Sequence, residues 1–293
     1  MSPPNLTGLS GLTEVGRGAY GVTYRAWHDR QRRHVAVKVL DTPADASAKR
    51  DFVRDCRALR RLSAHPNIIA VQRVGRTDAD RLYVVMPFHE RGSLAERTWR
   101  RGPLSWKKML DVGVRLAGGL HTAHDAGVLH RDIKPGNVLT DTGGAPQLTD
   151  FGQAGRIGPA LTGGGTVVAS PAYAAPEILR GAVPGTATDV YSLTATLVAL
   201  VNGRAPHSRH IGENVVSVMS RVLTDAPVDL RKEGVPADVC EVLEWGLEKD
   251  PRNRPPSAEV LGKALQGAQR RLRLPRTALP VTDRDRDRTQ RIR

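Results

Sequence analysis

The chain has 293 residues, 40% hydrophobic and 25% charged, which is enough apolar sequence to bury a core and excludes disorder throughout. Its formal net charge is +14, but from Leu265 onward nine arginines stand against three aspartates, so much of the excess lies in the last tenth of the chain. The two cysteines, Cys56 and Cys240, form no CxxC pair, which excludes a disulfide framework and a structural zinc site and favours a reducing, cytoplasmic location.

No secretion signal or membrane-spanning segment is expected. The longest apolar stretch, YSLTATLVALV at 191–201, is far shorter than the roughly 20 residues that cross a bilayer. The N-terminal MSPPNLTGLS lacks the basic and apolar regions of a signal peptide. The body of the chain is only moderately basic, so nucleic acid is not an expected partner.

The first third of the sequence predicts a small sheet with one helix. Residues 9–40 alternate short apolar runs with glycine turns and end in HVAVKVL, a strand pattern. ASAKRDFVRDCRALRRL carries Phe52, Cys56 and Leu59 at helical spacing, which predicts a helix over 46–62. HPNIIAV at 65–71 and RLYVVMPF at 81–88 predict two further strands.

A helical second part is predicted after a short connector near residues 87–92. Amphipathic stretches begin at 105–127 and recur at 188–202, 212–223, 237–248 and 257–272. The last stretch, PRTALPVTDRDRDRTQRIR, has two prolines and a repeated DR pair, so it is predicted to be disordered. We therefore expect an N-terminal sheet domain over 9–87, a helical domain over 88–265 and a disordered basic tail over 266–293.

Two features near the N-terminus point to phosphate binding. GRGAYG supplies Gly16, Gly18 and Gly21, but because the strand pattern VTYRAW follows, these glycines belong to a hairpin and not to a dinucleotide-binding turn. Alone the motif is weak, since glycines recur in turns. Lys38 lies in the apolar strand VAVKVL, where a buried ammonium needs anionic partners. A lysine reaching solvent from an edge strand is the alternative.

The segment LHRDIKPGNVL at 129–139 holds Asp132, Lys134 and Asn137 within six positions, and Asp150 follows a predicted hairpin at 138–149. Carboxylate and carboxamide oxygens suit Mg²⁺, which often binds through one or two protein groups and substrate phosphates. Asn137 and Asp150 fit that role. Asp132 is then left to accept a hydroxyl proton and Lys134 to neutralise phosphate charge. This chemistry indicates phosphoryl transfer.

The motifs GRGAYG, VAVK, HRDIKPGN, DFG and AAPE, in this order, resemble those of bacterial eukaryotic-type (Hanks-type) serine/threonine protein kinases. The resemblance covers roughly residues 9–265. The stretches VVMPFHERGSL and PQLTDFG look most similar to those of soluble actinobacterial kinases, including kinases fused to transcription-regulator modules. The resemblance implies an α+β bilobal fold, with an antiparallel sheet and one helix in the N-lobe and a mainly helical C-lobe.

The resemblance also implies the roles of single residues. It makes Asp132 the catalytic base, with Lys134 at the γ-phosphate, Lys38 at the α- and β-phosphates and Asp55 as the acid that pairs with Lys38. It assigns Asn137 and Asp150 to the metal. The nucleotide-binding residues it implies are Gly16, Arg17, Gly18, Gly21, Thr23, Ala36, Lys38, Met86, Pro87, His89 and Leu139. The implied cofactors are ATP and Mg²⁺, with Mn²⁺ as a substitute. The implied partners are proteins with Ser/Thr acceptors and a second copy of the chain for autophosphorylation.

Three supporting contacts follow from the same resemblance. Glu177 of AAPE is expected to pair with Arg254 as a structural ion pair. Asp189 is expected to brace the catalytic loop, a role compatible with capping its own helix. Ser170 is expected to support Asp132.

The sequence departs from the family pattern at three places. Asp55 stands where the pattern has glutamate, one methylene longer, so the helix would have to move inward by about 1 Å or more to pair with Lys38. Asp51, one turn earlier, is the alternative partner for this lysine. Thr23 replaces valine in the glycine loop, and Pro87 replaces the common hinge acid. A kinase-like ATP-binding scaffold with weak or no transfer is therefore the main alternative function.

The segment 153–174 is rich in glycine and holds Thr162 and Thr166. Its composition fits a plain loop, but Arg131 resembles the family arginine that pairs with a phosphorylated loop residue, which makes these threonines candidate autophosphorylation sites. A third interpretation assigns nucleic-acid or membrane-surface binding to the basic tail. Otherwise the tail is a solvated linker with phosphorylation candidates at Thr277, Thr282 and Thr289.

Overall fold

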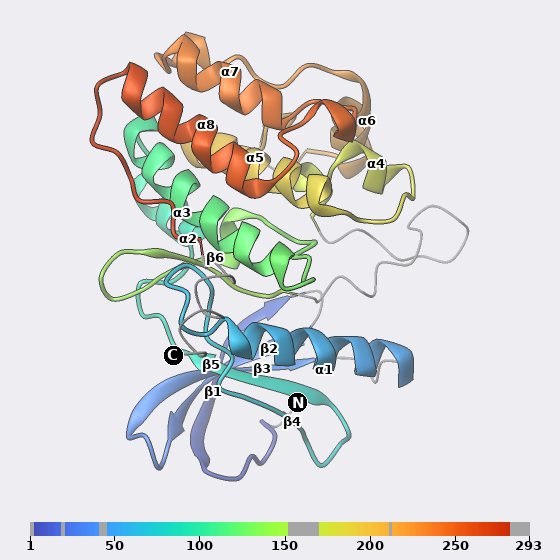
Figure 1. The fold of residues 1–293 in the computed structure, drawn as a ribbon. Helices are drawn as coiled ribbons and strands as arrows, with labels where there is room; N and C mark the ends of the chain where they lie inside the picture. The colour runs from blue at the N-terminus through green and yellow to red at the C-terminus, as the bar shows by residue number, and fades with distance from the viewer. Residues whose placement is uncertain (1–2, 19–20, 41–45, 152–169, 211–212, 282–293) are drawn as a thin grey trace, which may run out of the picture.

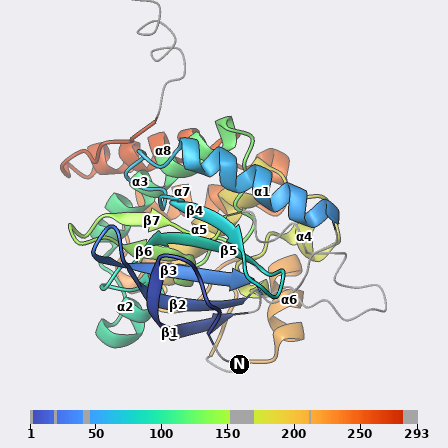
Figure 2. The ribbon, with the colours of Figure 1, turned by 90° about the horizontal axis from the view of Figure 1, so that it is seen from below.

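The computed structural model describes residues 3–18, 21–40, 46–151, 170–210 and 213–281. One end of the molecule is a five-stranded antiparallel sheet, which Figure 2 shows in the spatial order β1-β2-β3-β5-β4. Its strands are β1 (Leu9–Gly18), β2 (Gly21–His28), β3 (Arg33–Leu40), β4 (Arg73–Arg76) and β5 (Leu82–Pro87). Helix α1 (Ala46–Arg61) follows β3 and lies between the sheet and the helical part (Figure 1).

The rest of the described chain is mainly helical. Its longer helices are α2 (Leu94–Arg101), α3 (Trp106–Asp125), α5 (Thr186–Asn202), α6 (Val215–Thr224), α7 (Ala237–Gly246) and α8 (Ala258–Arg271). Its shorter elements are η1 (Pro135–Asn137), η3 (Pro171–Tyr173), α4 (Pro176–Leu179), η4 (Leu230–Glu233), η5 (Pro251–Asn253) and the hairpin β6 (Val138–Thr140) and β7 (Pro146–Leu148). The expected α+β arrangement, a sheet with one helix followed by a helical part, is confirmed.

The hydrophobic core consists mainly of two clusters, one in the helical part and one on the far face of the sheet. α3 and α5 are buried along most of their length and carry the largest apolar cluster, which also receives Cys56 and Leu59 of α1. The sheet has its own cluster on the opposite face, built from alternate residues of β3, Val35, Val37 and Val39. Because side chains alternate along a strand, the intervening Ala36 and Lys38 face the helical part.

Two of the expected elements are corrected by the structure. The apolar run at 65–71 is not a sheet strand. Ile69 donates its backbone N–H to the carbonyl of Leu148 in β7 (2.9 Å), and Ile68 and Ile69 are buried by packing between the two parts. The fourth strand lies later, at Arg73–Arg76. Helix α2 was missed, although Ser93 and Glu96 form a complete capping box at its start.

The expectation of a disordered tail from 266 onward is wrong for residues 266–281. Helix α8 continues to Arg271, and the segment after it packs along α3 and α8, with Pro280 against Gly118 and Leu279 against Gly262. Thr277 is buried: its Oγ1 lies 2.8 Å from Gln269 Nε2 and 3.2 Å from Asp111 Oδ1. The carbonyl of Pro280 accepts a hydrogen bond from His65 (2.9 Å), beside the sheet. A buried Thr277 does not fit the linker phosphorylation site expected there, and Thr282 and Thr289 lie outside the described residues.

Within the part of the chain that is described, the structure has no helix that combines the length and apolarity needed to cross a membrane. Both cysteines are buried free thiols. Burial, with the neighbouring Asp55 carboxylate, raises the pKa of Cys56 to about 12, so this thiol stays protonated at neutral pH.

Candidate active site

Lys38 joins the sheet to the helical part. Only 8% of the residue is exposed, and its Nζ lies 2.6 Å from Oδ2 of Asp150, in the loop after β7. The carboxylate supplies the anionic partner that a buried ammonium requires. The alternative of a lysine reaching solvent from an edge strand is wrong, because β3 lies in the middle of the sheet between β2 and β5.

Asp150 and Arg131 both hold a left-handed backbone, with φ of +66° and +70°. Residues other than glycine rarely adopt this backbone conformation, which costs them about 1–2 kcal/mol, and such residues are often found at functional sites. In this structure the two residues lie on the two loops whose motifs indicate phosphoryl transfer. The strained backbone therefore marks the same place as the sequence motifs.

The loop that precedes β6 brings Asp132, Lys134 and Asn137 into contact. Lys134 Nζ donates to Asp132 Oδ2 at 2.7 Å, and Asn137 Nδ2 donates to the same oxygen at 2.9 Å and to the Asp132 carbonyl at 2.7 Å. The short helix η1 makes the turn that allows this approach. Lys134 also donates to Ser170 Oγ at 2.8 Å, so Ser170 reaches Asp132 through the lysine.

Asp189, at the start of α5, holds the loop from beneath. Its two carboxylate oxygens accept the backbone N–H groups of His130 and Arg131, each at 2.7 Å, as the resemblance implied. His124, which the sequence analysis missed, places Nε2 2.9 Å from Oδ2. Burial alone would raise the pKa of Asp189, but the His124 hydrogen bond and charge and the Arg131 N–H outweigh burial and lower that pKa. The carboxylate therefore stays ionised.

His130 packs its ring against Phe151, the residue after Asp150. The two ring centroids are 4.4 Å apart, and His130 is fully buried. Burial lowers the pKa of His130 in spite of the nearby carboxylates, so the ring is neutral, and its Nδ1 accepts the backbone N–H of Asp132 at 3.4 Å. The loop of Asp132 and the loop of Asp150 are thus packed against each other.

Asn137 and Asp150 are held close by the backbone, since Thr149 donates its N–H to the Asn137 carbonyl at 3.0 Å. Their side chains offer carboxylate and carboxamide oxygens, which suit a hard cation such as Mg²⁺. Among the described residues, no group of three or more His, Cys, Asp and Glu side chains is arranged to hold a metal ion. A metal here would therefore depend on oxygens from a second molecule, as a phosphate-bound Mg²⁺ does.

An apolar surface lies beside the ion pair. Ala36 of β3 and Met86 of β5 are paired across the sheet and form one cluster with Ile69, against which Leu139 of β6 packs. The residues named for an adenine site from the sequence are therefore together, and Ile69 joins them. The connector begins at Pro87, the last residue of β5, and His89 Nε2 lies 2.9 Å from Gln147 Oε1.

The glycine hairpin joins β1 to β2. Gly16 pairs with Thr23, Arg17 with Val22 and Gly18 with Gly21. Position 21 requires a glycine: the φ of Gly21 is +151°, and a Cβ there would lie 2.1 Å from the carbonyl oxygen of Val39. Thr23 also lies opposite Lys38 of β3. Arg17 forms an exposed ion pair with Glu14 at 3.0 Å, and Ala19 and Tyr20 lie outside the described residues.

Asp55 lies on α1 and is 6% exposed. Its Oδ1 accepts hydrogen bonds from the Arg54 guanidinium at 3.2 and 3.3 Å. In the described part of the chain, the ion pair of Lys38 is with Asp150. A role for Asp55 beside Lys38 therefore stays a prediction. Thr162 and Thr166, the candidate phosphorylation sites, lie outside the described residues.

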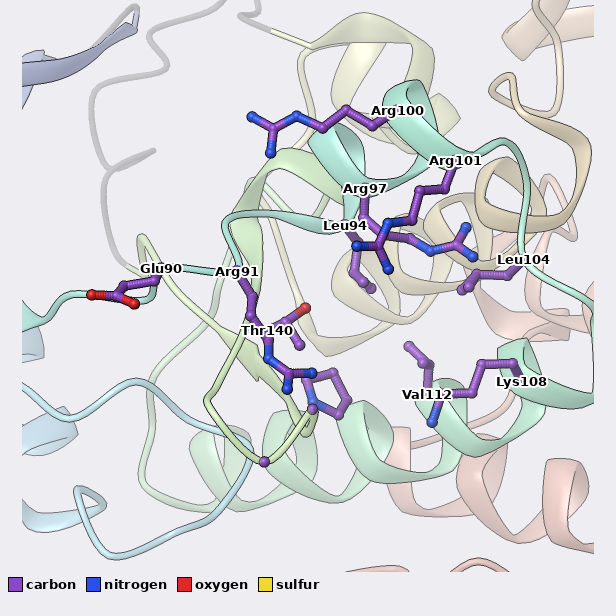
Figure 3. A pocket seen from close by; sticks show the side chains of 13 residues that line it. Glu90, Arg91, Leu94, Arg97, Arg100, Arg101, Leu104, Lys108, Val112 and Thr140 are labelled. Carbon is purple, nitrogen blue, oxygen red and sulfur yellow. The ribbon is translucent and has the colours of Figure 1, made fainter.

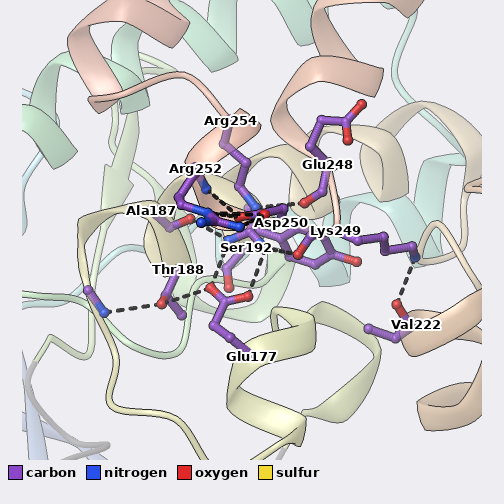
Figure 4. A network of polar contacts seen from close by, with 12 residues as sticks. Glu177, Ala187, Thr188, Ser192, Val222, Glu248, Lys249, Asp250, Arg252 and Arg254 are labelled. Carbon is purple, nitrogen blue, oxygen red and sulfur yellow. Dashed lines mark hydrogen bonds and ion pairs between the residues drawn. The ribbon is translucent and has the colours of Figure 1, made fainter.

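Glu177 and Arg254 form the structural ion pair that the resemblance implied. Two guanidinium nitrogens donate to the two carboxylate oxygens, each at 2.7 Å, and the Arg254 side chain is fully enclosed. Its remaining N–H groups meet backbone carbonyls (Figure 4). Burial alone would raise the pKa of Glu177, but the Arg254 hydrogen bonds and charge lower it. Thr188, which the sequence analysis missed, donates to Glu177 at 3.1 Å.

Comparison with known families and proteins agrees with this geometry. A family model described as the protein kinase domain matches residues 9–265. The serine/threonine-protein kinase PknK of Mycobacterium tuberculosis is 45% identical over 264 residues, which are 90% of this chain and 24% of PknK. The serine/threonine-protein kinase PknJ of the same species is 35% identical over 262 residues, 87% of this chain and 44% of PknJ. The chain thus spans about a quarter of PknK and under half of PknJ.

Two solved structures share the fold. Rad53 in complex with AMP-PNP superposes with a TM-score of 0.72 at 22% identity, covering 88% of this chain and 65% of that one. The PknI kinase domain of Mycobacterium tuberculosis gives 0.65 at 24% identity, covering 90% and 97%. These likenesses confirm the kinase-like bilobal fold, and the sequence relatives confirm the resemblance to bacterial serine/threonine kinases.

Proposed function

The chain belongs to the protein kinase domain family, and from this we propose that it transfers the γ-phosphate of ATP to serine and threonine hydroxyls of proteins, with itself among the substrates. The observation that carries the proposal is the contact of Asp132 with both Lys134 and Asn137 next to the Lys38–Asp150 ion pair. Phosphoryl transfer needs positioned charges more than covalent chemistry by the protein. These five side chains supply a base, two cations and two metal-binding groups in one place.

Each of these groups has one task in the proposal. Asp132 accepts the proton of the attacking hydroxyl, and Lys134, 2.7 Å from it, neutralises charge on the transferring phosphate. Lys38 exchanges its contact with Asp150 for the α- and β-phosphates. Asn137 and Asp150 hold Mg²⁺, which neutralises phosphate oxygens when bound, and Mn²⁺ is a chemically similar substitute.

At the other end of the nucleotide, the cluster of Ala36, Met86 and Leu139 covers the adenine, and the backbone of Pro87 and His89 forms hydrogen bonds with its edge. The buried apolar surface of the cluster supports this placement. Gly16, Arg17, Gly18 and Gly21 cover the phosphates with their backbone, and Thr23 lies below the adenine. Gly21 supports this placement, because its lack of a side chain lets the hairpin pack closely against β3, the strand of Lys38.

We also propose regulation by autophosphorylation at Thr162 or Thr166. Arg131 supports this proposal: its Nε is buried and, in the described part of the chain, has no hydrogen-bond partner. An unsatisfied buried N–H costs about 1–3 kcal/mol, which a phosphate oxygen would recover. Self-association for transfer between two copies belongs to the same proposal. A cytoplasmic location stays a prediction from the sequence.

The test compares Asp132→Asn with Asp125→Asn, a matched change at a half-exposed carboxylate at the end of α3. Transfer of labelled phosphate from Mg·ATP to protein Ser/Thr should fall by ~10²–10⁴-fold in the first variant only. Mass-spectrometric mapping of the labelled residues reports the acceptor and the loop sites. Nucleotide binding without transfer in the parent chain would instead favour the scaffold, and equal transfer in both variants would contradict the role of Asp132.

A further inference from the structure

A large pocket lies on the surface of the helical part, next to the connector that follows β5. Its volume is about 750 Å³, within the range of ligand sites in proteins. It lies between α2, the N-terminal half of α3 and the β6–β7 turn (Figure 3). We call it the basic pocket. Among the described residues, its cationic lining residues are Arg91, Arg97, Arg100, Arg101 and Lys108, and its acidic lining residue is Glu90.

The cations of the basic pocket are only partly neutralised by the protein. Arg97 donates to the carbonyl of Gly102 at 2.6 Å, and Lys108 pairs with Asp111 at 2.7 Å. Within the described ranges, Arg91 and Arg101 are exposed and have neither an ion pair nor a side-chain hydrogen bond. In Figure 3, Arg100 and Glu90 point away from the other labelled side chains, so Glu90 does not offset the charge. The pocket is therefore a concave surface with an excess of positive charge.

The floor of the basic pocket is apolar. Leu94, Leu104 and Val112 are buried beneath the charged rim. The walls are held by backbone contacts: the Leu104 N–H donates to the Leu200 carbonyl at 2.6 Å, and the Thr140 N–H donates to the Gly92 carbonyl at 3.0 Å. A site fixed in this way loses little freedom on binding.

The chemistry of the lining selects among anionic ligands. Single-stranded nucleic acid is held by basic grooves in which bases stack on aromatic rings, and none of the described residues that line the pocket is aromatic. An apolar floor under a cationic rim instead fits a peptide with apolar side chains between carboxylates, since electrostatic complementarity steers and orients such a segment.

We propose that the basic pocket binds an acidic, partly apolar segment of a partner protein. The inference goes beyond phosphoryl transfer, because this binding needs neither nucleotide nor Asp132. The connector places the bound segment next to the nucleotide end of the active site: Glu90 and Arg91 directly follow His89, and Thr140 directly follows Leu139.

The experiment measures binding of a short fluorescent peptide of alternating glutamate and leucine to the whole chain, without ATP, by fluorescence anisotropy. Saturable binding is expected, and the same peptide with glutamine in place of glutamate should not bind. Raising NaCl from about 50 mM to about 500 mM should weaken binding, because screening reaches full effect at exposed charges. Equal binding of the glutamine peptide would overturn the proposal.

The variant Arg91→Glu/Arg101→Glu should bind the glutamate peptide ~5-fold more weakly or worse, since two exposed charge attractions become repulsions. Its matched control is Arg57→Glu/Arg270→Glu, which reverses two exposed arginines on α1 and α8. An equal loss in both variants would assign the binding to the general charge of the chain and overturn the proposal. A fluorescent oligodeoxynucleotide that binds more tightly than the peptide, and in a way that depends on Arg91 and Arg101, would assign the pocket to nucleic acid.

A second measurement avoids variants and any folding defect they cause. A zero-length carbodiimide couples carboxylates to amines in contact, so it should join a peptide glutamate to Lys108 in the parent chain. Lys232 and Lys263 lie on other elements and serve as internal controls. Peptide coupled to these lysines and not to Lys108 would place the ligand elsewhere and contradict the proposal.

Discussion

The ammonium of Lys38 lies 2.6 Å from the carboxylate of Asp150, and both side chains are largely buried, with 10% and 19% exposed. A central strand of the sheet is thereby tied to the loop after β7 across the junction of the two parts. Removing one partner of such a pair leaves an uncompensated buried charge. Lys38 is consequently held by Asp150. The acid that the family resemblance assigns to Lys38 is Asp55 of α1.

We expect Asp55→Glu to raise the rate of phosphate transfer several-fold in protein that has first been dephosphorylated with a phosphatase. The longer side chain reaches about 1 Å further, so α1 needs less inward movement to pair with Lys38. Initial rates at saturating Mg·ATP check this. Asp125→Glu, the same extension at a half-exposed carboxylate at the end of α3, is the matched control and should leave the rate unchanged. An equal or lower rate in Asp55→Glu would show that the shorter acid does not limit the enzyme.

Asp189→Asn is expected to lower kcat by ~10–100-fold with little change in the KM for ATP. The carboxylate accepts two backbone N–H groups, whereas the amide has one oxygen and would turn an N–H toward another donor. Loss of one charge-assisted hydrogen bond costs roughly 1.5–3 kcal/mol and loosens the loop of Asp132. Steady-state kinetics at varied ATP separate the two constants. An unchanged kcat would contradict the bracing role.

Thr277→Glu is expected to lower the free energy of unfolding by about 2–4 kcal/mol, since it removes two hydrogen bonds and buries a carboxylate near Asp111. Burial tends to raise the pKa of Asp111, but its hydrogen bonds from Lys108 and Arg115 lower it, so the two carboxylates repel. Urea unfolding measures the loss, and Ala278→Glu, at an exposed neighbour, is the matched control. Equal stability of the two variants would show that the segment after α8 is not firmly packed.

Local patterns in the sequence were sufficient for most elements of the fold. The period of two in VAVKVL fixes the face on which Lys38 lies, and the period near four locates α1, α3, α5 and α8 within a few residues. The same reasoning failed where an apolar run is buried without joining the sheet, as at Ile68 and Ile69. It also missed α2, although the spacing of Ser93 and Glu96 is a capping signal.

The candidate site was predictable as a set of motifs but not as a set of contacts. Spacing within one loop places Asp132 near Asn137. No local pattern could indicate that Lys38 pairs with Asp150, 112 positions later, or that His124 meets Asp189, because those distances depend on the packing of separate elements. The burial of Thr277 was missed for the same reason: a polar, proline-containing sequence gives no sign of the groove it fills.

His207 gives a prediction for pH. The residue is buried between Tyr191 and Lys249, each 3.3 Å from its Nε2. Burial and the charge of Lys249 lower its pKa from 6.5 to about 4. The unfolded chain therefore binds more protons between pH 6.5 and 4, so the stability that neutral His207 contributes is present above pH 6.5 and is lost as the pH falls toward 4.

The variant His207→Gln cannot take up this proton, so it should lose less stability on acidification than the parent. Between about pH 7.5 and about pH 5, the parent should lose about 2 kcal/mol more than the variant. Urea unfolding of both chains at the two pH values gives the difference, in which the contribution of other titrating groups cancels. A difference near zero would mean that His207 is protonated in the folded state at pH 5, and hence that the apolar surroundings and Lys249 do not keep it neutral.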